Sequence, residues 1–87
     1  MHDYDNYKYY TDGKVIDLTE IQNELLNLLI ENKNHLVTFE EIIKRTRFEE
    51  YKTFMRPSIC VNICRLRKKC NLHISIIYGM GYCLRSE

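Results

Sequence analysis

Two helix starts with the same chemistry lie 19 residues apart and limit the folds open to this chain. Thr19 is followed three residues later by Gln22, and Thr38 is followed in the same way by Glu41. A threonine and a Gln or Glu at this spacing cap a helix reciprocally, because each side chain bonds the other residue's backbone N–H. Apolar residues at helical spacing follow each pair, so the sequence predicts two amphipathic helices. The apolar positions are Ile21, Leu25, Leu26, Leu28, Leu29 and Ile30 in the first helix and Phe39, Ile42 and Ile43 in the second.

A third helix is predicted over residues 57–70, PSICVNICRLRKKC, with Pro57 in the first turn, where backbone N–H groups have no partner within the helix. At about 100° per residue, four of its apolar side chains point within about 40° of one direction and form a stripe that faces the core. They are Ile59, Ile63, Leu66 and Cys70. The opposite side carries Ser58, Val61, Arg65 and Lys68, with Asn62 and Lys69 along one margin and Cys60, Cys64 and Arg67 along the other.

Short strands are predicted on either side of the helices. Residues 7–17, YKYYTDGKVID, place Asp12-Gly13 between two strand-like segments, and this dipeptide is typical of a hairpin turn. Residues 74–84, ISIIYGMGYCL, predict a second hairpin around Gly79-Met80-Gly81. Residues 48–56 follow neither period and are expected to form a loop. The tyrosines near the N-terminus are expected to pack on a sheet; they are Tyr4, Tyr7, Tyr9 and Tyr10.

The order of these elements predicts an α+β fold, a winged helix-turn-helix with a short N-terminal β-hairpin, three helices and a C-terminal β-hairpin wing. A chain of 87 residues suffices for one small domain. We expect a single domain over residues 1–87, with the N-terminal hairpin at 1–17, a three-helix core at 18–73 and the wing at 74–87.

Basic residues are concentrated toward the C-terminus. Residues 1–54 hold 7 basic and 11 acidic side chains, a net charge of −4, whereas residues 55–87 hold 6 basic and 1 acidic, a net charge of +5. This asymmetry favours a polyanionic partner for the basic part. The chain has no apolar run of 18 residues, and its start, MHDYDNYKYY, lacks the apolar stretch of a signal peptide. A cytoplasmic protein without membrane contact is therefore expected.

The cysteine spacing favours neither a metal site nor a disulfide. It is Cys60-x3-Cys64-x5-Cys70, followed by Cys83, and lacks the Cys-x2-Cys pair of many zinc sites. Cysteines of a cytoplasmic protein are expected to be reduced. Cys60 and Cys64 are neighbours on one flank of the third helix, where a disulfide is disfavoured and a metal ion would need a further ligand such as Cys83 or His73. We therefore predict no metal site and no cofactor.

Catalytic chemistry is not indicated either. The histidines, His2, His35 and His73, lie far apart in the sequence, without an evident nucleophile or acid partner. The sequence also lacks a glycine-rich phosphate-binding loop. The chain is predicted not to be an enzyme.

The outer face of the third helix carries residue types that suit DNA. An α-helix fits the major groove, where arginine is the commonest bidentate partner of guanine. Arg65 lies in the middle of this face, beside Ser58 and Val61, which suit base edges and the thymine methyl group. The surrounding cations are placed for phosphate contacts; they are Arg56, Arg67, Lys68 and Lys69. A solvated basic face without a partner is the alternative interpretation.

Three segments of the chain resemble one family of transcription factors. They are LTEIQNELLNLLIENKNHLVTFEEII, ICVNICRLRKKC and IIYGMGYCL. From Leu18 onward, over about 70 residues, the chain resembles the C-terminal DNA-binding domain of OmpR/PhoB-type response regulators. The resemblance implies a third helix in the major groove of double-stranded DNA and a wing toward the minor groove. It further implies dimers on direct repeats, control by the phosphorylated receiver domain of a two-component system, and contact of residues 47–55 with RNA polymerase.

The resemblance also assigns roles by position. It implies base contacts for Ser58, Val61 and Arg65, and positions near the DNA backbone for Asn62, Arg67 and Lys68. Tyr82 corresponds to the wing tyrosine, whose hydroxyl meets a phosphate, and Tyr78 stands where the family has a wing arginine.

Several positions depart from the family pattern. Cys64 replaces the first arginine of the third-helix run, Arg56-Pro57 shifts another arginine by one residue, and Tyr78 removes a wing cation. Fewer cationic contacts should weaken DNA binding and flatten its salt dependence. Gln22-Asn23 replaces a Glu-Phe pair, and the N-terminal sheet is expected to be reduced to one hairpin. The 87 residues include no receiver domain, so they are either a domain of a longer regulator or a free-standing regulator.

These departures leave two further hypotheses open. The domain could bind a protein instead of DNA, through its tyrosine-rich N-terminus or through residues 47–55. Alternatively, oxidation or metal binding at Cys60 and Cys64 could modulate DNA binding, with Cys64 as the regulatory thiol.

Overall fold

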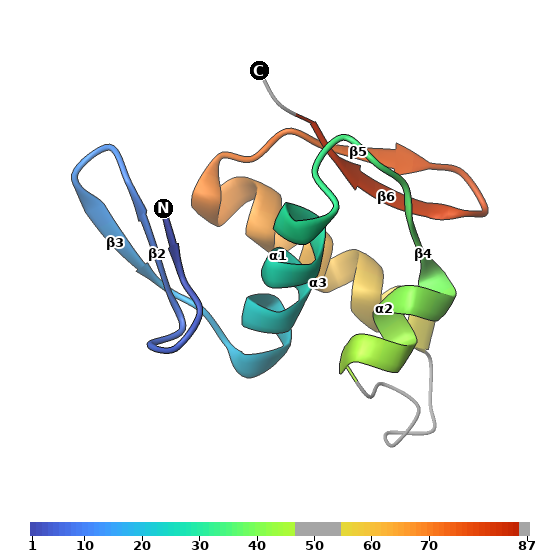
Figure 1. The fold of residues 1–87 in the computed structure, drawn as a ribbon, viewed down its shortest axis with the longest axis horizontal. Coiled ribbons are helices and arrows are strands. Elements are labelled where there is room, and N and C mark those ends of the chain that lie inside the picture. The colour runs from blue at the N-terminus through green and yellow to red at the C-terminus, as the bar shows by residue number, and fades with distance from the viewer. Residues whose placement is uncertain (47–54, 86–87) are drawn as a thin grey trace.

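The computed structural model describes residues 1–46 and 55–85, and at residues 46 and 55–58 it describes the backbone alone (Figure 1). Within this part of the chain, an N-terminal sheet contains β1 (His2–Asp3), β2 (Lys8–Thr11) and β3 (Lys14–Asp17). The helices are α1 (Glu20–Glu31), α2 (Phe39–Thr46) and α3 (Met55–Cys70). A second sheet contains β4 (Val37–Thr38), β5 (Ile74–Ile77) and β6 (Gly81–Leu84) in the spatial order β4-β6-β5.

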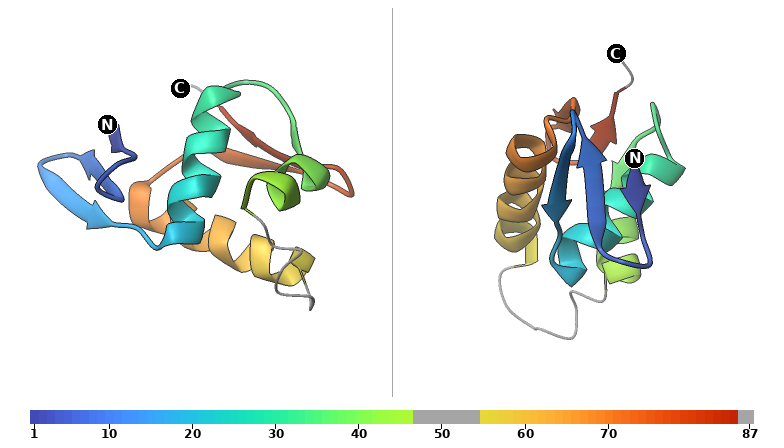
Figure 2. Two further views of the ribbon diagram at one scale, coloured as in Figure 1. Left: turned by 60° about the horizontal axis from the view of Figure 1, so that its bottom comes forward. Right: turned by 90° about the vertical axis from the view of Figure 1, so that its left-hand side faces the viewer.

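The helices lie between the two sheets (Figures 1 and 2). α1 packs against both α2 and α3, and β6 of the second sheet also contacts α1. The β5–β6 hairpin extends away from the helices as a wing (Figure 2). This is the α+β winged helix-turn-helix that the sequence predicted. None of the described helices is both long and apolar enough to cross a bilayer.

The N-terminal sheet confirms the predicted hairpin and adds a strand to it. β2 and β3 pair antiparallel, and the turn residues Asp12 and Gly13 both have positive φ, 47° and 75°, as a two-residue hairpin turn requires. β1 then pairs with β2, His2 opposite Tyr9 and Asp3 opposite Lys8. The expectation of one hairpin was therefore wrong, because a strand of two residues is too short to show an alternating pattern.

Both predicted capping boxes are confirmed. The Thr19 hydroxyl accepts the Gln22 backbone N–H and the Gln22 side chain accepts the Thr19 N–H, each at 3.2 Å. Thr38 and Glu41 repeat the exchange, again at 3.2 Å in both directions. Each pair satisfies backbone donors that a helix start leaves unpaired. α1 and α2 therefore begin where local chemistry alone would start them.

α3 begins at Met55, which is earlier than the predicted start at Pro57. Met55 and Arg56 thus belong to the helix and not to the predicted loop. The remainder of that loop prediction, residues 48–54, lies outside the described residues. The predicted core stripe of α3 is confirmed, because all four of its apolar side chains are buried; they are Ile59, Ile63, Leu66 and Cys70.

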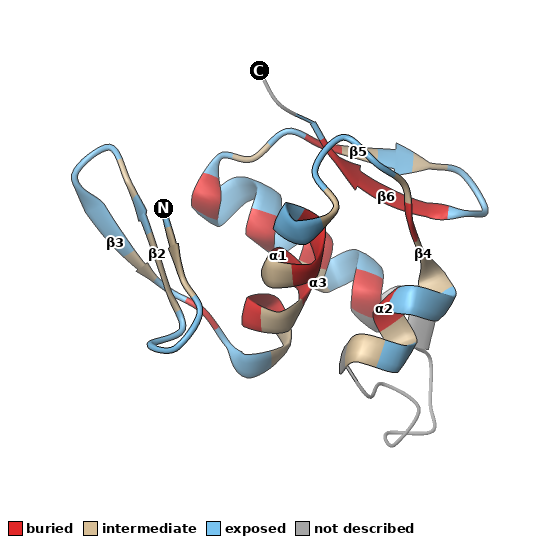
Figure 3. Ribbon diagram, in the orientation of Figure 1, coloured by how far each residue is buried: buried red, intermediate tan, exposed pale blue. Residues whose placement is uncertain are grey.

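α1 packs against α2, α3 and β6, and most of the apolar positions predicted for it are buried. Leu25, Leu26 and Leu29 are fully buried between the neighbouring elements (Figure 3). Burial of a Leu or Ile side chain contributes about 1.5–3 kcal/mol, and these three leucines together with the α3 stripe make up half of the buried core cluster. Ile30 is exposed, contrary to the prediction. Of the tyrosines expected to pack on the sheet, Tyr9 packs against the core, whereas Tyr4, Tyr7 and Tyr10 are exposed.

Strand β4 was not predicted. It pairs the segment directly before α2 with β6 of the wing. Val37 pairs with Tyr82 and Thr38 with Gly81. A Cβ atom added at Gly81 would lie 2.0 Å from the Val37 carbonyl oxygen. Only glycine leaves room for this close backbone approach, so the Gly81 position couples the wing to the start of α2.

Gly81→Ala is therefore expected to lower the free energy of unfolding by roughly 1–3 kcal/mol, because the methyl group forces β4 and β6 apart. Gly79→Asn is the matched control, since Gly79 has φ of +73° and open space around its Cα, and Asn tolerates that conformation better than other side chains. Urea denaturation of both variants checks this. A Gly81→Ala domain as stable as the wild type would contradict the close approach.

Candidate nucleic-acid interface

The outer face of α3 is available to a partner. Val61 is 46% exposed although it is apolar, and Arg65 and Lys68 are exposed beside it. Among the described residues, neither Arg65 nor Lys68 has a hydrogen-bond or ion-pair partner. Figure 3 shows this exposed face alternating with the buried stripe along α3. The structure thus brings together three of the predicted site residues in an exposed, cationic face, while the side chains of Arg56 and Ser58 lie outside the described part.

The two margins of this face differ from each other. On one margin Cys60, Cys64 and Arg67 are exposed, and the Arg67 guanidinium reaches the Ile74 carbonyl oxygen of β5 at 3.5 Å. On the other margin Asn62 is half-buried. The Arg67 contact is long for a hydrogen bond, so this guanidinium is held only weakly by the protein.

Lys69 was predicted to lie near a phosphate, but its ammonium group is engaged within the protein. It donates to the Asp17 carbonyl oxygen at 2.7 Å and to the Gln22 side-chain oxygen at 3.0 Å. These contacts connect the end of α3 to the junction between β3 and α1. The structure therefore gives Lys69 a role in holding the fold, and its predicted phosphate contact remains untested.

Tyr82 is a core residue of the wing. Its side chain is 3% exposed and packs edge-to-face on the Phe39 ring, with ring centroids 5.6 Å apart. Burial, the nearby thiols of Cys60 and Cys64 and a hydrogen-bond interaction with Cys60 together raise the pKa of Tyr82 to about 12. Because the Tyr82 side chain is buried, its predicted phosphate contact is less accessible than the sequence implied.

The wing tip is apolar and exposed. Tyr78 is 97% exposed in the turn of the hairpin, and two neighbouring apolar residues, Ile76 of β5 and Met80 of the turn, are exposed as well. The Met80 N–H donates to the Ile77 carbonyl oxygen at 3.0 Å and closes the turn. The tip is thus positioned to contact a partner through an aromatic ring where the family pattern has a cation.

Two polar residues of α1 that the sequence did not single out as functional connect this helix to neighbouring elements. Asn23 is fully buried; its amide nitrogen donates to the Tyr4 carbonyl oxygen at 3.0 Å, and its oxygen lies 2.7 Å from the His2 ring nitrogen. Gln22 caps α1, and its side-chain oxygen accepts a hydrogen bond from the Lys69 ammonium group. Gln22 and Asn23 thus make polar contacts at the positions where the family pattern has a Glu-Phe pair. Two polar side chains within an otherwise apolar helical face were the sequence signal for these contacts.

An ion-pair network joins α1 to α2. Arg45 forms two hydrogen bonds with the Glu31 carboxylate, at 3.0 and 3.1 Å, and its Nε lies 3.4 Å from Glu24. The hydrogen bonds from Arg45 hold the pKa of Glu31 below its usual value. The Tyr4 hydroxyl donates to Glu24 and extends this network to the N-terminal sheet.

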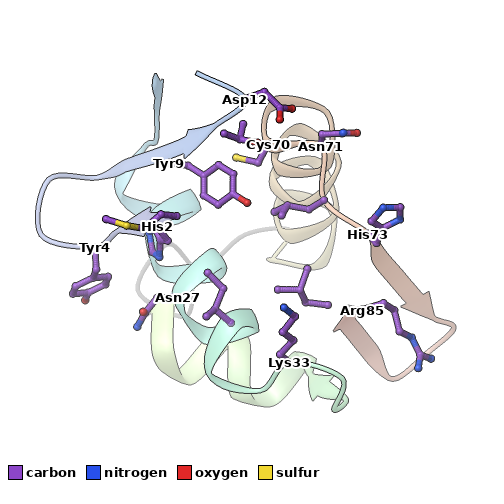
Figure 4. Close-up of a pocket in the computed structure, with 15 residues that line it drawn as sticks. His2, Tyr4, Tyr9, Asp12, Asn27, Lys33, Cys70, Asn71, His73 and Arg85 are labelled. Carbon is purple, nitrogen blue, oxygen red and sulfur yellow. The ribbon is translucent and has the colours of Figure 1, made fainter. Parts of the chain in front are cut away.

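An open groove of about 820 Å³ lies between the N-terminal sheet, α1 and the end of α3 (Figure 4). His2, Tyr9, Cys70, His73 and Arg85 are among the residues that line it. Its walls mix aromatic, apolar and cationic side chains without a convergent set of acids. Across the described part of the chain, no group of three or more potential metal ligands is found. The groove therefore has no evident chemistry of its own.

Residues 13–84 match the protein family described as "Transcriptional regulatory protein, C terminal". The chain belongs to this family. The match runs from the first hairpin turn through β6 and so includes the helices and the wing. The OmpR/PhoB-type resemblance of the sequence is confirmed, and the family is one of transcription regulators, not of enzymes.

Two relatives of this transcriptional regulatory domain have names that describe regulatory proteins. The response regulator ArlR of Staphylococcus saprophyticus is 36% identical over 89 residues, covering 95% of this chain and 40% of ArlR. The regulatory protein VanR of Enterococcus faecium is 29% identical over 82 residues, covering 87% of this chain and 36% of VanR. The chain thus spans about two fifths of the length of these relatives.

Solved structures agree with the family assignment. The DNA-binding domain of Bacillus subtilis CssR is 30% identical, with a TM-score of 0.84 and 97% coverage of both chains. The C-terminal domain of the nisin resistance regulator NsrR is 22% identical with a TM-score of 0.77, covering 94% of this chain and 88% of that domain. At that identity the NsrR similarity concerns the fold alone.

In this transcriptional regulatory domain, Lys69→Met is expected to lower the free energy of unfolding by about 1 kcal/mol, because it removes both contacts between α3 and the β3–α1 junction. Lys68→Met is the matched control: it removes the same charge one residue away, but no hydrogen bond or ion pair with a described residue. Thermal and urea denaturation of the two variants would decide this. Equal stability of both variants would show that the Lys69 contacts contribute nothing.

Proposed function

We propose that this domain binds double-stranded DNA sequence-specifically and thereby regulates transcription. One observation carries the proposal: α3 is anchored by one buried stripe and presents an exposed face on which Arg65 and Lys68 have no hydrogen-bond or ion-pair partner among the described residues. No described residue pairs with these two cationic side chains. They are therefore suited to contact base edges and phosphates. The similarity to the DNA-binding domain of CssR supports the same proposal.

In the proposed complex α3 lies in the major groove. Arg65 contacts a guanine, and Val61 packs on a thymine methyl group. Lys68 on this face and Arg67 on its margin contact phosphates and fix the register of the helix. Ser58, Arg56 and Asn62 complete the proposed interface, with Ser58 toward the bases and the other two toward the backbone.

The wing approaches the adjacent minor groove in this proposal. Tyr78 is the most exposed side chain of the hairpin tip and would contact the sugar–phosphate edge through its ring and hydroxyl. Because neither Tyr78 nor Cys64 is cationic, the complex involves fewer phosphate contacts than the family pattern implies. We therefore expect a shallower dependence of affinity on salt concentration.

The proposal extends to the assembly that the family pattern implies. The domain would bind direct repeats as a dimer in the cytoplasm, under the control of a receiver domain, and residues 47–55 would contact RNA polymerase. The names of ArlR and VanR, a response regulator and a regulatory protein, support the regulatory role. Residues 47–54 lie outside the described part of the chain, so this contact rests on the family resemblance.

Arg65→Ala is expected to weaken binding to the preferred DNA site by about 1–3 kcal/mol and to relax base preference at one position. Lys68→Ala should weaken binding to all sequences alike and reduce the salt slope by about 1, because it removes a phosphate contact. Lys14→Ala is the matched control, since it removes an exposed positive charge from the N-terminal sheet. Fluorescence anisotropy at two salt concentrations measures all three variants.

Unchanged affinity and site preference in Arg65→Ala would contradict the base-contacting role of that residue. If the wild-type domain binds no DNA even at low salt but forms a tight complex with another protein, the DNA-binding proposal is wrong and the protein-interaction hypothesis replaces it.

A further inference from the structure

A pair of thiols on the flank of α3 has no part in the proposed DNA contacts. Cys60 and Cys64 are both exposed and both are free thiols. They are separated by four positions in one helix, so their side chains lie side by side one turn apart. The other two cysteines, Cys70 and Cys83, are buried in the core. The exposed thiols therefore form a distinct pair.

The spacing of the pair favours one kind of chemistry over another. Cβ atoms four residues apart in a helix are about 5–6 Å from each other, whereas a disulfide needs a Cβ–Cβ distance of about 3.5–4.5 Å. Metal–thiolate bonds are about 2.3 Å long, so an ion bound between two sulfurs separates them by roughly 4–5 Å. The helical spacing therefore suits a bridging ion better than a disulfide.

The surroundings of the pair also select among metal ions. Zinc sites in proteins almost always have four ligands, or three with a water, and no group of three candidate ligands occurs among the described residues. Soft thiolate donors favour soft ions such as Cu(I), for which two sulfurs can suffice. The Tyr82 hydroxyl interacts with the Cys60 side chain, and as a hydrogen-bond donor it would support the Cys60 sulfur as an anion. Because Tyr82 is packed on Phe39, this donor is held in place.

We propose that Cys60 and Cys64 together bind one soft monovalent cation, of the class of Cu(I) and Ag(I), and that this ion weakens DNA binding. Two neutral thiols lose two protons and gain one positive charge, so the flank changes from neutral to singly negative. Arg67 lies on the same flank, and the adjacent face carries Arg65 and Lys68, so the new charge opposes the phosphates that these residues would contact. This second part of the proposal rests on the proposed function.

Silver(I) nitrate titration into the reduced domain in chloride-free buffer, followed by native mass spectrometry and ultraviolet absorption, tests the site itself. The wild type is expected to bind one ion with highest affinity, and Cys60→Ser or Cys64→Ser is expected to lower that affinity at least about tenfold. The Cys60→Ser/Cys64→Ser double variant retains both buried thiols and so controls for Cys70 and Cys83. Both substitutions are at exposed positions, and circular dichroism would verify the fold. Equal silver affinity in the wild type and the double variant would overturn the site.

Anisotropy with labelled DNA, with and without one equivalent of silver(I), tests the coupling. The affinity of the wild type should fall roughly five- to tenfold, while that of the double variant should not change. Silver binding at the pair without a change in DNA affinity would overturn the coupling. If the silver-free domain binds no DNA, the proposed function and the coupling fail together, whereas the mass spectrometry still decides whether the pair binds the ion.

Discussion

Ile59, Ile63 and Leu66 remove one side of α3 from water and place it against the rest of the core, and this burial determines which side chains of the helix face outward. A rotation of α3 by one residue position, about 100°, would carry charged side chains toward the core, where an unpaired charge costs several kcal/mol. The exposed positions of Arg65 and Lys68 thus follow from the hydrophobic contact on the opposite face. The proposed DNA interface depends on that contact more than on any interaction of its own.

Polar contacts attach the remaining elements to this core. Buried Asn23 binds the strand region of His2 and Tyr4, and Lys69 ties the end of α3 to Asp17 and Gln22. Buried hydrogen bonds specify orientation because a displaced partner leaves an unsatisfied polar group behind. At the other end, the close approach of Gly81 to the β4 backbone sets the wing relative to α2. The wing, α3 and the N-terminal sheet are therefore held in a defined arrangement around the exposed face.

Features that depend on neighbouring residues were predicted well, and features that depend on distant ones were not. The capping boxes and the α3 stripe follow from spacings of three or four residues, and both are confirmed. β1 and β4 have two residues each, so only their pairing partners reveal them. Lys69 was assigned to DNA because its partners, Gln22 and Asp17, lie 47 and 52 residues away in the sequence. The roles of the site residues in DNA contact stay predictions.

Selection of double-stranded DNA from a random library by the purified domain, at low and at moderate salt, tests the central claim most directly. The account predicts one enriched motif that persists at the higher salt concentration, because base contacts from the exposed face of α3 give sequence preference beyond charge attraction. Direct repeats of that motif would also reveal the spacing of the bound domains. Recovery of DNA without any enriched motif, or no recovery at either salt concentration, would contradict sequence-specific binding by this face.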